Sequence, residues 1–172
     1  VLFSQSVGNP RLLELPPLVA AEIQLNLMLG LDVLSEVSLW RRTAGGLECL
    51  LSLGGVGDPS RRVRAEAKAV LRGRSRLSLL GGSALRSAPV NRFGQPYAAV
   101  VGRVGSVDAD IADAFLAEAA SALAPVVERE QLLEHSAERE QMLVASAERR
   151  LMRLGFDLHD GLVGLDLEEH VA

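Results

Sequence analysis

Apolar side chains over residues 126–158 recur at alternating spacings of four and three. The seam is formed by Val126, Leu133, Ala137, Val144, Ala147, Leu151, Leu154 and Leu158, and Glu130 and Glu140 occupy its two remaining positions. Such a heptad seam is typical of a coiled coil. Because a lone helix cannot bury so narrow a stripe, the pattern predicts a partner helix. The simplest partner is the same helix of a second copy, in a homodimer.

Before this seam, the pattern changes between helical and alternating segments. Residues 17–35 keep helical spacing, although alternation within the segment leaves a strand open as the alternative. Residues 37–53 alternate around a Thr-Ala-Gly-Gly turn and predict an antiparallel hairpin. A short helix is predicted over residues 63–71, with Asp58 or Ser60 as its cap.

The pattern continues with a short strand over residues 77–80 and a second hairpin over residues 85–104, joined by a turn-rich connector at 91–96. A helix follows, and Pro125 should kink or break it because proline removes a helical hydrogen bond. This order predicts an α+β fold, an antiparallel sheet with helices packed on one side. After this domain, the sequence predicts a long C-terminal helix that forms a dimeric parallel coiled coil.

Composition narrows the function classes. The chain has 172 residues, and its hydrophobic content of 48% suffices for one compact domain plus an extended element. Its net charge of -4 argues against nucleic acid as a partner. Arginines do cluster over residues 61–76, without interleaved aromatic side chains. They indicate a solvated helix and loop, with an anion site as the alternative.

The chain contains one cysteine, Cys49, which excludes an internal disulfide and fits a reducing, cytoplasmic location. No uncharged run is long enough to predict a membrane span or a secretory signal. The chain starts at Val1 and ends shortly after residue 159, so we expect a fragment of a longer protein. Whether that protein is anchored in a membrane stays open.

His159 is the candidate nucleophile. It follows the seam residue Leu158 and should stand beside the dimer interface with its ring reaching water. Neutral imidazole is a competent nucleophile near neutral pH, and Asp160 could hold the reactive tautomer. Gly155 and Gly161 flank the pair and would let another domain approach closely. The alternative is that the pair is ordinary solvated surface.

The residues around His159 resemble a known motif. Arg153 and the run Asp157-Leu158-His159-Asp160-Gly161 resemble the phosphoacceptor box of bacterial sensor histidine kinases with a Leu-His-Asp-Gly core. The resemblance implies that His159 is phosphorylated from ATP, with magnesium, and that Asp160 assists as acid or base. It also implies the receiver domain of a response regulator as partner.

Two positions depart from the family's pattern. Phe156 stands where an arginine is usual, and Gly164 stands where a glutamine commonly positions water for dephosphorylating the partner. Phosphatase activity is therefore in doubt. The chain also lacks any resemblance to a nucleotide-binding site, so we expect no autokinase activity from the isolated chain.

The element order, together with this box, resembles the GAF sensor domains that often precede it, with a PAS-like sheet as the nearest alternative. The implied domain covers residues 12–124. Residues 1–11 would be linker, residues 125–150 a signalling coiled coil, and residues 151–172 the start of the dimerisation and phosphoacceptor helix.

GAF domains as a class bind small molecules between the sheet and its covering loops, here expected around residues 54–83. All three histidines lie outside the implied domain, which disfavours a histidine-held haem, and no Cys/His cluster has metal-site spacing. Cys49 could anchor a linear tetrapyrrole, but a buried structural role is favoured. Trp40 could stack on a ligand or pack at the sheet edge. The sequence itself names no cofactor.

Two functions follow from these patterns. The first is a sensory and dimerisation fragment of a two-component sensor histidine kinase, relaying a signal from the GAF-like domain to His159. The second is a dimeric ligand-binding or scaffold module without phosphotransfer. Whether the chain is part of an enzyme stays open at this point.

Overall fold

The computed structural model describes residues 9–55, 57–74, 84–105 and 108–168, with the side chains of residues 109 and 155–168 outside this description. The predicted strand at residues 77–80 lies outside the described residues. The chain divides into two compact units, Val1–Glu130 and Gln131–Ala172.

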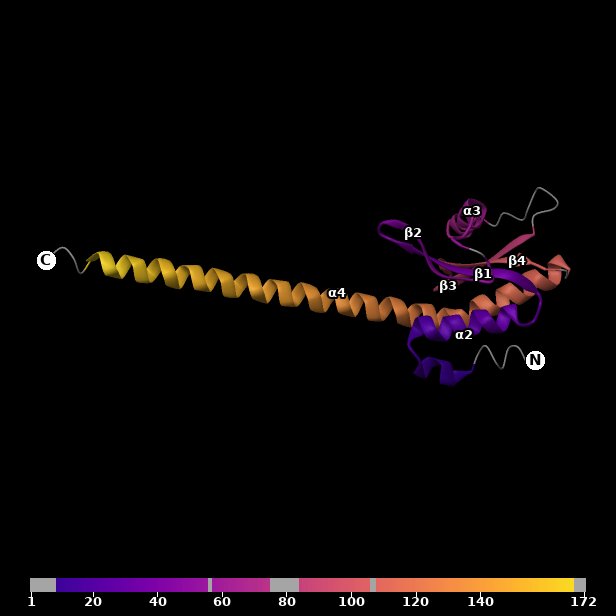
Figure 1. Ribbon diagram of the computed structural model, residues 1–172, viewed down its shortest axis with the longest axis horizontal. Coiled ribbons are helices and arrows are strands. Elements are labelled where there is room, and N and C mark those ends of the chain that lie inside the picture. Colours follow the sequence, from indigo (N-terminus) through magenta and orange to yellow (C-terminus); the bar gives the residue numbers. More distant parts are fainter. Residues whose placement is uncertain (1–8, 56, 75–83, 106–107, 169–172) are drawn as a thin grey trace. The chain divides into compact units, whose positions relative to one another are not determined.

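The first unit is built on one antiparallel sheet (Figure 1). Its strands lie in the order β2-β1-β4-β3, so β1 and β4 are central. They are β1 (Leu34–Thr43), β2 (Gly46–Leu53), β3 (Leu85–Arg92) and β4 (Gln95–Val104). Both predicted hairpins are confirmed. The second closes more tightly than the predicted connector, because Phe93 and Gly94 both adopt positive φ, which suits a two-residue hairpin turn.

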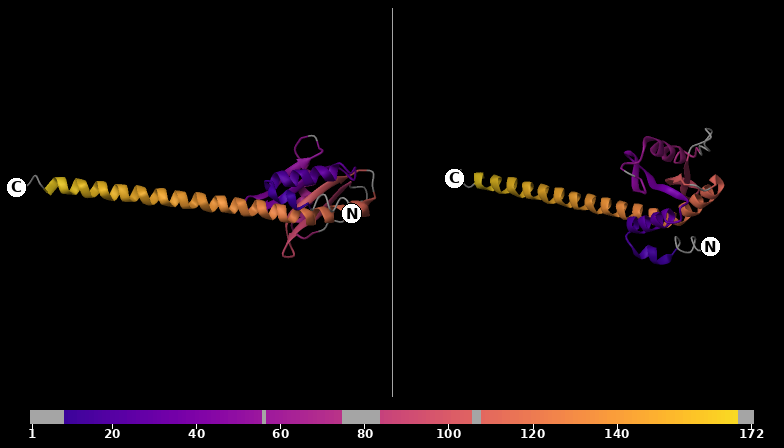
Figure 2. Two further views of the ribbon diagram at one scale, coloured as in Figure 1. Left: turned by 90° about the horizontal axis from the view of Figure 1, so that it is seen from below. Right: turned by 45° about the vertical axis from the view of Figure 1, so that its right-hand side comes forward.

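Helices cover both faces of this sheet (Figure 2). They are the short 3-10 helix η1 (Pro10–Glu14), α2 (Pro17–Leu29), α3 (Arg61–Val70) and α4 (Ala109–Glu168). Side chains of α2 and α4 pack in the core of one face, and those of α3 pack in the core of the other. The prediction that all helices pack on one side is therefore wrong for α3.

Alternation along the strands explains the two cores. On β4, Ala98 and Val100 contribute to the core beneath α2 and α4, whereas Ala99 and Val101 contribute to the core beneath α3. A central strand covered on both faces has no side that can be polar, so this part of β4 is a continuous apolar run. Trp40 of β1 is 3% exposed under α3. Of the two roles considered for Trp40, packing at the sheet edge is wrong, because β1 is a central strand.

The helix ends follow local sequence signals. Of the two predicted caps for α3, Ser60 is the one used, since its hydroxyl oxygen accepts a hydrogen bond from the backbone N–H of Val63. The segment from Pro17 is a helix and not the alternative strand. It ends at Leu29, earlier than predicted, and Asp32 in the following turn has a positive φ of 55°.

Helix α4 continues through Pro125, so of the predicted kink or break, the break is wrong. The adjacent turns are held by core packing, with Leu123, Val126 and Val127 at most 3% exposed. This burial offsets the lost helical hydrogen bond. Val126 packs in the core of its own unit, so the prediction that the seam begins at this residue is wrong.

Candidate functional site

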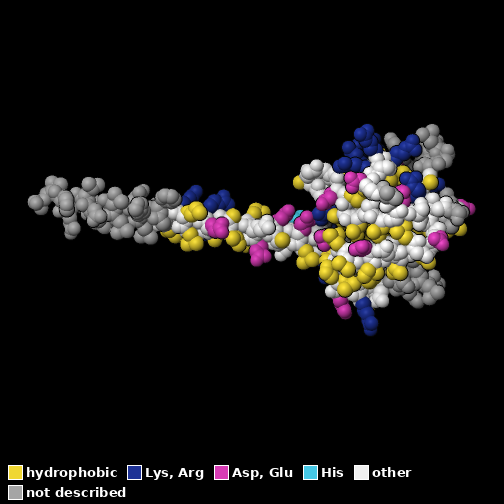
Figure 3. Space-filling model, viewed as in Figure 1, with side chains coloured by type: hydrophobic (Ala, Val, Ile, Leu, Met, Phe, Trp, Pro, Cys, Tyr) yellow, Lys and Arg dark blue, Asp and Glu magenta, His cyan; other side chains and the backbone are white. Residues whose placement is uncertain are grey.

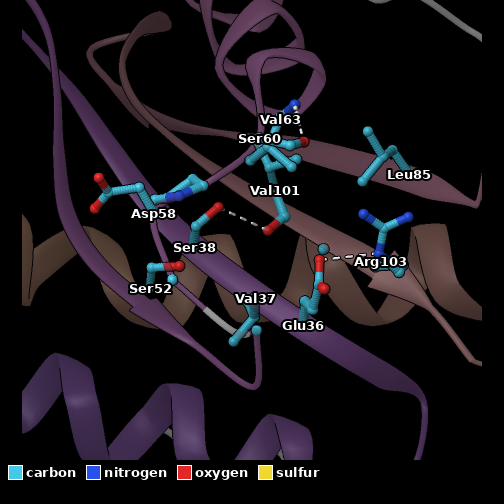
Figure 4. Close-up of a pocket in the computed structure, with 14 residues that line it drawn as sticks. Glu36, Val37, Ser38, Ser52, Asp58, Ser60, Val63, Leu85, Val101 and Arg103 are labelled. Carbon is cyan, nitrogen blue, oxygen red and sulfur yellow. Dashed lines mark hydrogen bonds and ion pairs between the residues drawn. The ribbon is translucent and has the colours of Figure 1, made fainter.

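A small pocket lies between the sheet and the segment that leads into α3 (Figure 4). Its volume is about 110 Å³. The strands contribute Glu36, Ser38, Ser52 and Arg103, and the segment before α3 contributes Asp58 and Ser60. Part of the expected ligand region, residues 54–83, therefore does line a pocket. The contribution of the central strands was not predicted.

The inner wall of the pocket is polar but already hydrogen-bonded. Ser38 is 3% exposed, and its hydroxyl donates to the carbonyl oxygen of Val101 at 3.3 Å and accepts from Nε1 of Trp40 at 2.8 Å. Trp40 therefore supports this wall from the core side. Its position explains why a buried serine is tolerated in a strand whose neighbours are apolar.

An ion pair stands at the rim of the pocket. Nε of Arg103 lies 2.9 Å from a carboxylate oxygen of Glu36, and both side chains are more than a third exposed. Such a pair offers a donor surface and an acceptor surface to a bound molecule. At about 110 Å³, the pocket suits a small polar molecule and not a cofactor-sized ligand.

The described residues contain no group of three or more His, Cys, Asp or Glu side chains that could hold a metal ion. Cys49 is half-buried beside the core under α3, and its thiol donates to the carbonyl oxygen of Leu51 at 3.3 Å. Burial raises the pKa of this thiol, so it is a weak nucleophile near neutral pH. These contacts favour a structural role.

The end of the β3–β4 hairpin is fastened to α4, an arrangement that no sequence signal indicated. The hydroxyl of Tyr97 donates to the carbonyl oxygen of Ala124 at 2.7 Å, next to Pro125. Arg92 forms an ion pair with Glu128 at 2.9 Å. Burial and the nearby Glu128 raise the pKa of Tyr97 to about 12, so its hydroxyl keeps its proton at neutral pH.

The second unit presents exposed apolar side chains. Leu133, Val144, Leu151 and Leu154, four members of the predicted seam, are 52 to 68% exposed. Large exposed apolar stripes on a helix are characteristic of surfaces that another helix covers. His159 and Asp160 lie within the span of α4, but their side chains lie outside the described residues.

No helix in the described part of the chain is long and apolar enough to span a membrane.

No family model matches this chain, and no curated protein matches it. Among solved structures, the chain is similar to the GAF domain of an Acinetobacter phosphoenolpyruvate-protein phosphotransferase. The match has a TM-score of 0.52 at 12% identity and covers 76% of this chain and 90% of that one. Likeness at this identity shows the fold alone. The chain thus has a GAF-like fold with a long C-terminal helix, as the resemblance implied.

Proposed function

We propose that this chain is the sensory and dimerisation part of a bacterial two-component sensor histidine kinase. One observation carries the proposal: α4 contributes to the core of a GAF-like domain and also spans the Leu-His-Asp-Gly box. A change in the domain core therefore acts on the same helix that carries His159. The pocket beside β1 and β4 is the proposed site for a small polar signal molecule.

Strand β4 offers a physical route from the pocket to α4. Val101 and Arg103 of this strand line the pocket, and Tyr97 of the same strand holds the carbonyl of Ala124. A ligand that shifts the pocket end of β4 would therefore alter the restraint on α4 near Pro125. Coupling through one rigid element requires that element to have two arrangements, which the ligand then biases.

The proposed dimer uses the seam of the second unit. Glu130 stands at the seam position just before this unit and Glu140 within it; such residues weaken a coiled coil, and polar seam residues can allow two packings of similar energy. Two such packings are what a transmitting helix needs.

The proposed chemistry is phosphoryl transfer. A ring nitrogen of His159 would attack the γ-phosphorus of ATP, the bond to the bridging oxygen would break, and ADP would leave. Asp160 would take up or orient the proton on the other ring nitrogen. ATP and magnesium would be held by another domain, because the sequence resembles no nucleotide site. A receiver domain of a response regulator would then accept the phosphoryl group.

Labelled ATP and a complete kinase of the same subfamily test this chemistry. We expect label on the wild-type chain and on a His135→Gln variant, which removes an exposed histidine from the same helix. We expect none on His159→Gln. Labelling that survives His159→Gln would contradict the assignment of His159. Turnover of ATP by the isolated chain would contradict the expectation that another domain holds ATP.

The second candidate is a dimeric ligand-binding or scaffold module, which the polar pocket also supports. It predicts a dimer and a bound small molecule, with no phosphate on His159 under the same conditions.

A further inference from the structure

Helix α3 carries a stripe of positive charge along one side. Arg61, Arg64 and Lys68 follow one another at spacings of three and four, which places them on one face of α3, and Arg72 follows in the turn after the helix and lines the same groove. Arg42 of β1 lines the same groove beside the helix. In Figure 3, Lys and Arg side chains, coloured dark blue, gather on the surface over α3.

This stripe works against the stability of its own helix. Like charges at these spacings repel one another. Arg61, Arg62 and Arg64 also stand at the start of α3, where the helix dipole favours acidic residues and the first turn has none. The chain as a whole has a net charge of -4, so acidic residues are plentiful. None of the described residues that line the groove is acidic. An anionic partner would supply the missing charge.

The groove itself runs between α3 and the turn of the β1–β2 hairpin. Its volume is about 820 Å³. Leu47, Ala65 and Leu71 give its lining an aliphatic part. Arg64 donates to the carbonyl oxygen of Leu47 at 3.2 Å, and Arg42 donates to that of Leu71. These two hydrogen bonds connect α3 and its C-terminal end with strands β1 and β2, which form the two sides of the groove. A guanidinium has five N–H donors, so the same arginines can also hold an oxyanion.

We propose that this groove docks an acidic amphipathic helix of a partner protein. From Arg61 to Lys68 the helical part of the stripe extends for about 10 Å at 1.5 Å per residue, or about two turns of helix, and Arg72 continues it in the turn that follows. A partner helix with a carboxylate at every fourth residue would place its charges at the same intervals. Its neighbouring leucines would meet Leu47 and Leu71. Arginine predominates in the stripe, and its planar fork suits carboxylates.

Other anions match the groove less well. No aromatic side chain lines it among the described residues, so bases of a nucleic acid would find nothing to stack on. A short polyphosphate would span only part of the stripe and would leave the aliphatic lining uncovered. The partner helix is the only one of these ligands that uses both the charge and the aliphatic part.

Fluorescence anisotropy with the full chain and a labelled synthetic peptide, Glu-Ala-Ala-Leu repeated four times, tests the proposal. We compare Arg61→Glu/Lys68→Glu, which reverses two groove charges, with Arg62→Glu/Arg74→Glu. The second variant makes the same change in net charge with two exposed residues that do not line the groove. Circular dichroism and urea unfolding verify that both variants fold.

We expect the groove variant to weaken peptide binding by about tenfold or more, since each reversed charge loses an attraction and gains a repulsion. The control variant should change it by less than about twofold. Equal effects of the two variants would overturn the proposal. Equal binding of a Lys-Ala-Ala-Leu peptide would also overturn it. A third contrary result is that tripolyphosphate or anionic vesicles bind through the groove while the acidic peptide does not bind.

Discussion

Replacing Tyr97 by phenylalanine removes one hydroxyl and, with it, the hydrogen bond to the carbonyl oxygen of Ala124. The ring keeps its place beside the core, so the change isolates the bond that joins β4 to α4. A hydrogen bond of this kind contributes about 1 kcal/mol to the free energy of unfolding. We expect Tyr97→Phe to lose about that amount at neutral pH.

The same hydroxyl makes the free energy of unfolding depend on pH in the alkaline range. The pKa of Tyr97 is raised from 10 to about 12, because burial disfavours the charged phenolate. Below about pH 10 the hydroxyl is protonated in both the folded and the unfolded chain, and its full contribution is present. As the pH rises from about 10 towards 12, the unfolded chain releases the proton first, so stability falls. Partial exposure to solvent limits the loss to about 1–2 kcal/mol.

Two assays read this out. Tyr97 is the only tyrosine of the chain, so the ultraviolet absorbance of tyrosinate reports its titration directly. Urea unfolding at about pH 9 and about pH 11 then compares the wild type with Tyr97→Phe. We expect the wild type to lose more stability than the variant between these two pH values. A titration near the ordinary value of about 10 would refute the reasoning. Equal stability of the two proteins at both pH values would refute it too.

Two further predictions concern residues of the first unit, a pair of glycines and the cysteine. Gly54→Ala should lower the free energy of unfolding by about 2 kcal/mol or more, because Gly54 has a φ of +82° and a Cβ would lie 2.4 Å from the backbone oxygen of Ser35. Gly57→Ala is the control, since its φ is +83° with nothing within 4 Å of the added Cβ, and it should cost only about 1 kcal/mol. In alkylation at about pH 8, Cys49 should react more slowly in the folded chain than in urea, because burial raises the pKa of its thiol. Equal losses for the two glycine variants, or equal alkylation rates, would contradict these expectations.

Local sequence patterns predicted most of the fold. Alternation predicted both hairpins, since each pairs neighbouring strands through a short turn, and Ser60 could be named as a cap because its partner, Val63, lies three residues away. The pairing of β1 with β4 joins residues far apart in the sequence, and no local signal reports it. For that reason one of the two roles considered for Trp40 placed it at the sheet edge.

The same limit applies to the candidate site. Residues 54–83 were expected to cover a ligand, and some of them do line the pocket. The ion pair of Glu36 with Arg103 and the bond from Tyr97 to Ala124 both depend on contacts between distant segments. From the sequence, Val126 could belong to the heptad seam or to the core of the domain, because both environments select an aliphatic side chain. Only the packing of α4 against the sheet distinguishes them.

Sedimentation equilibrium of the full chain tests most directly whether two copies associate through the α4 seam. The mass of one chain is 18.4 kDa. We expect the wild type to sediment at twice that mass and Leu151→Glu, which places a charge in the seam, to sediment as a single chain. Met142→Glu is the matched control, since Met142 is 64% exposed on the same helix but lies off the seam, and it should remain a dimer. A wild-type chain that sediments at 18.4 kDa would contradict the proposed dimer.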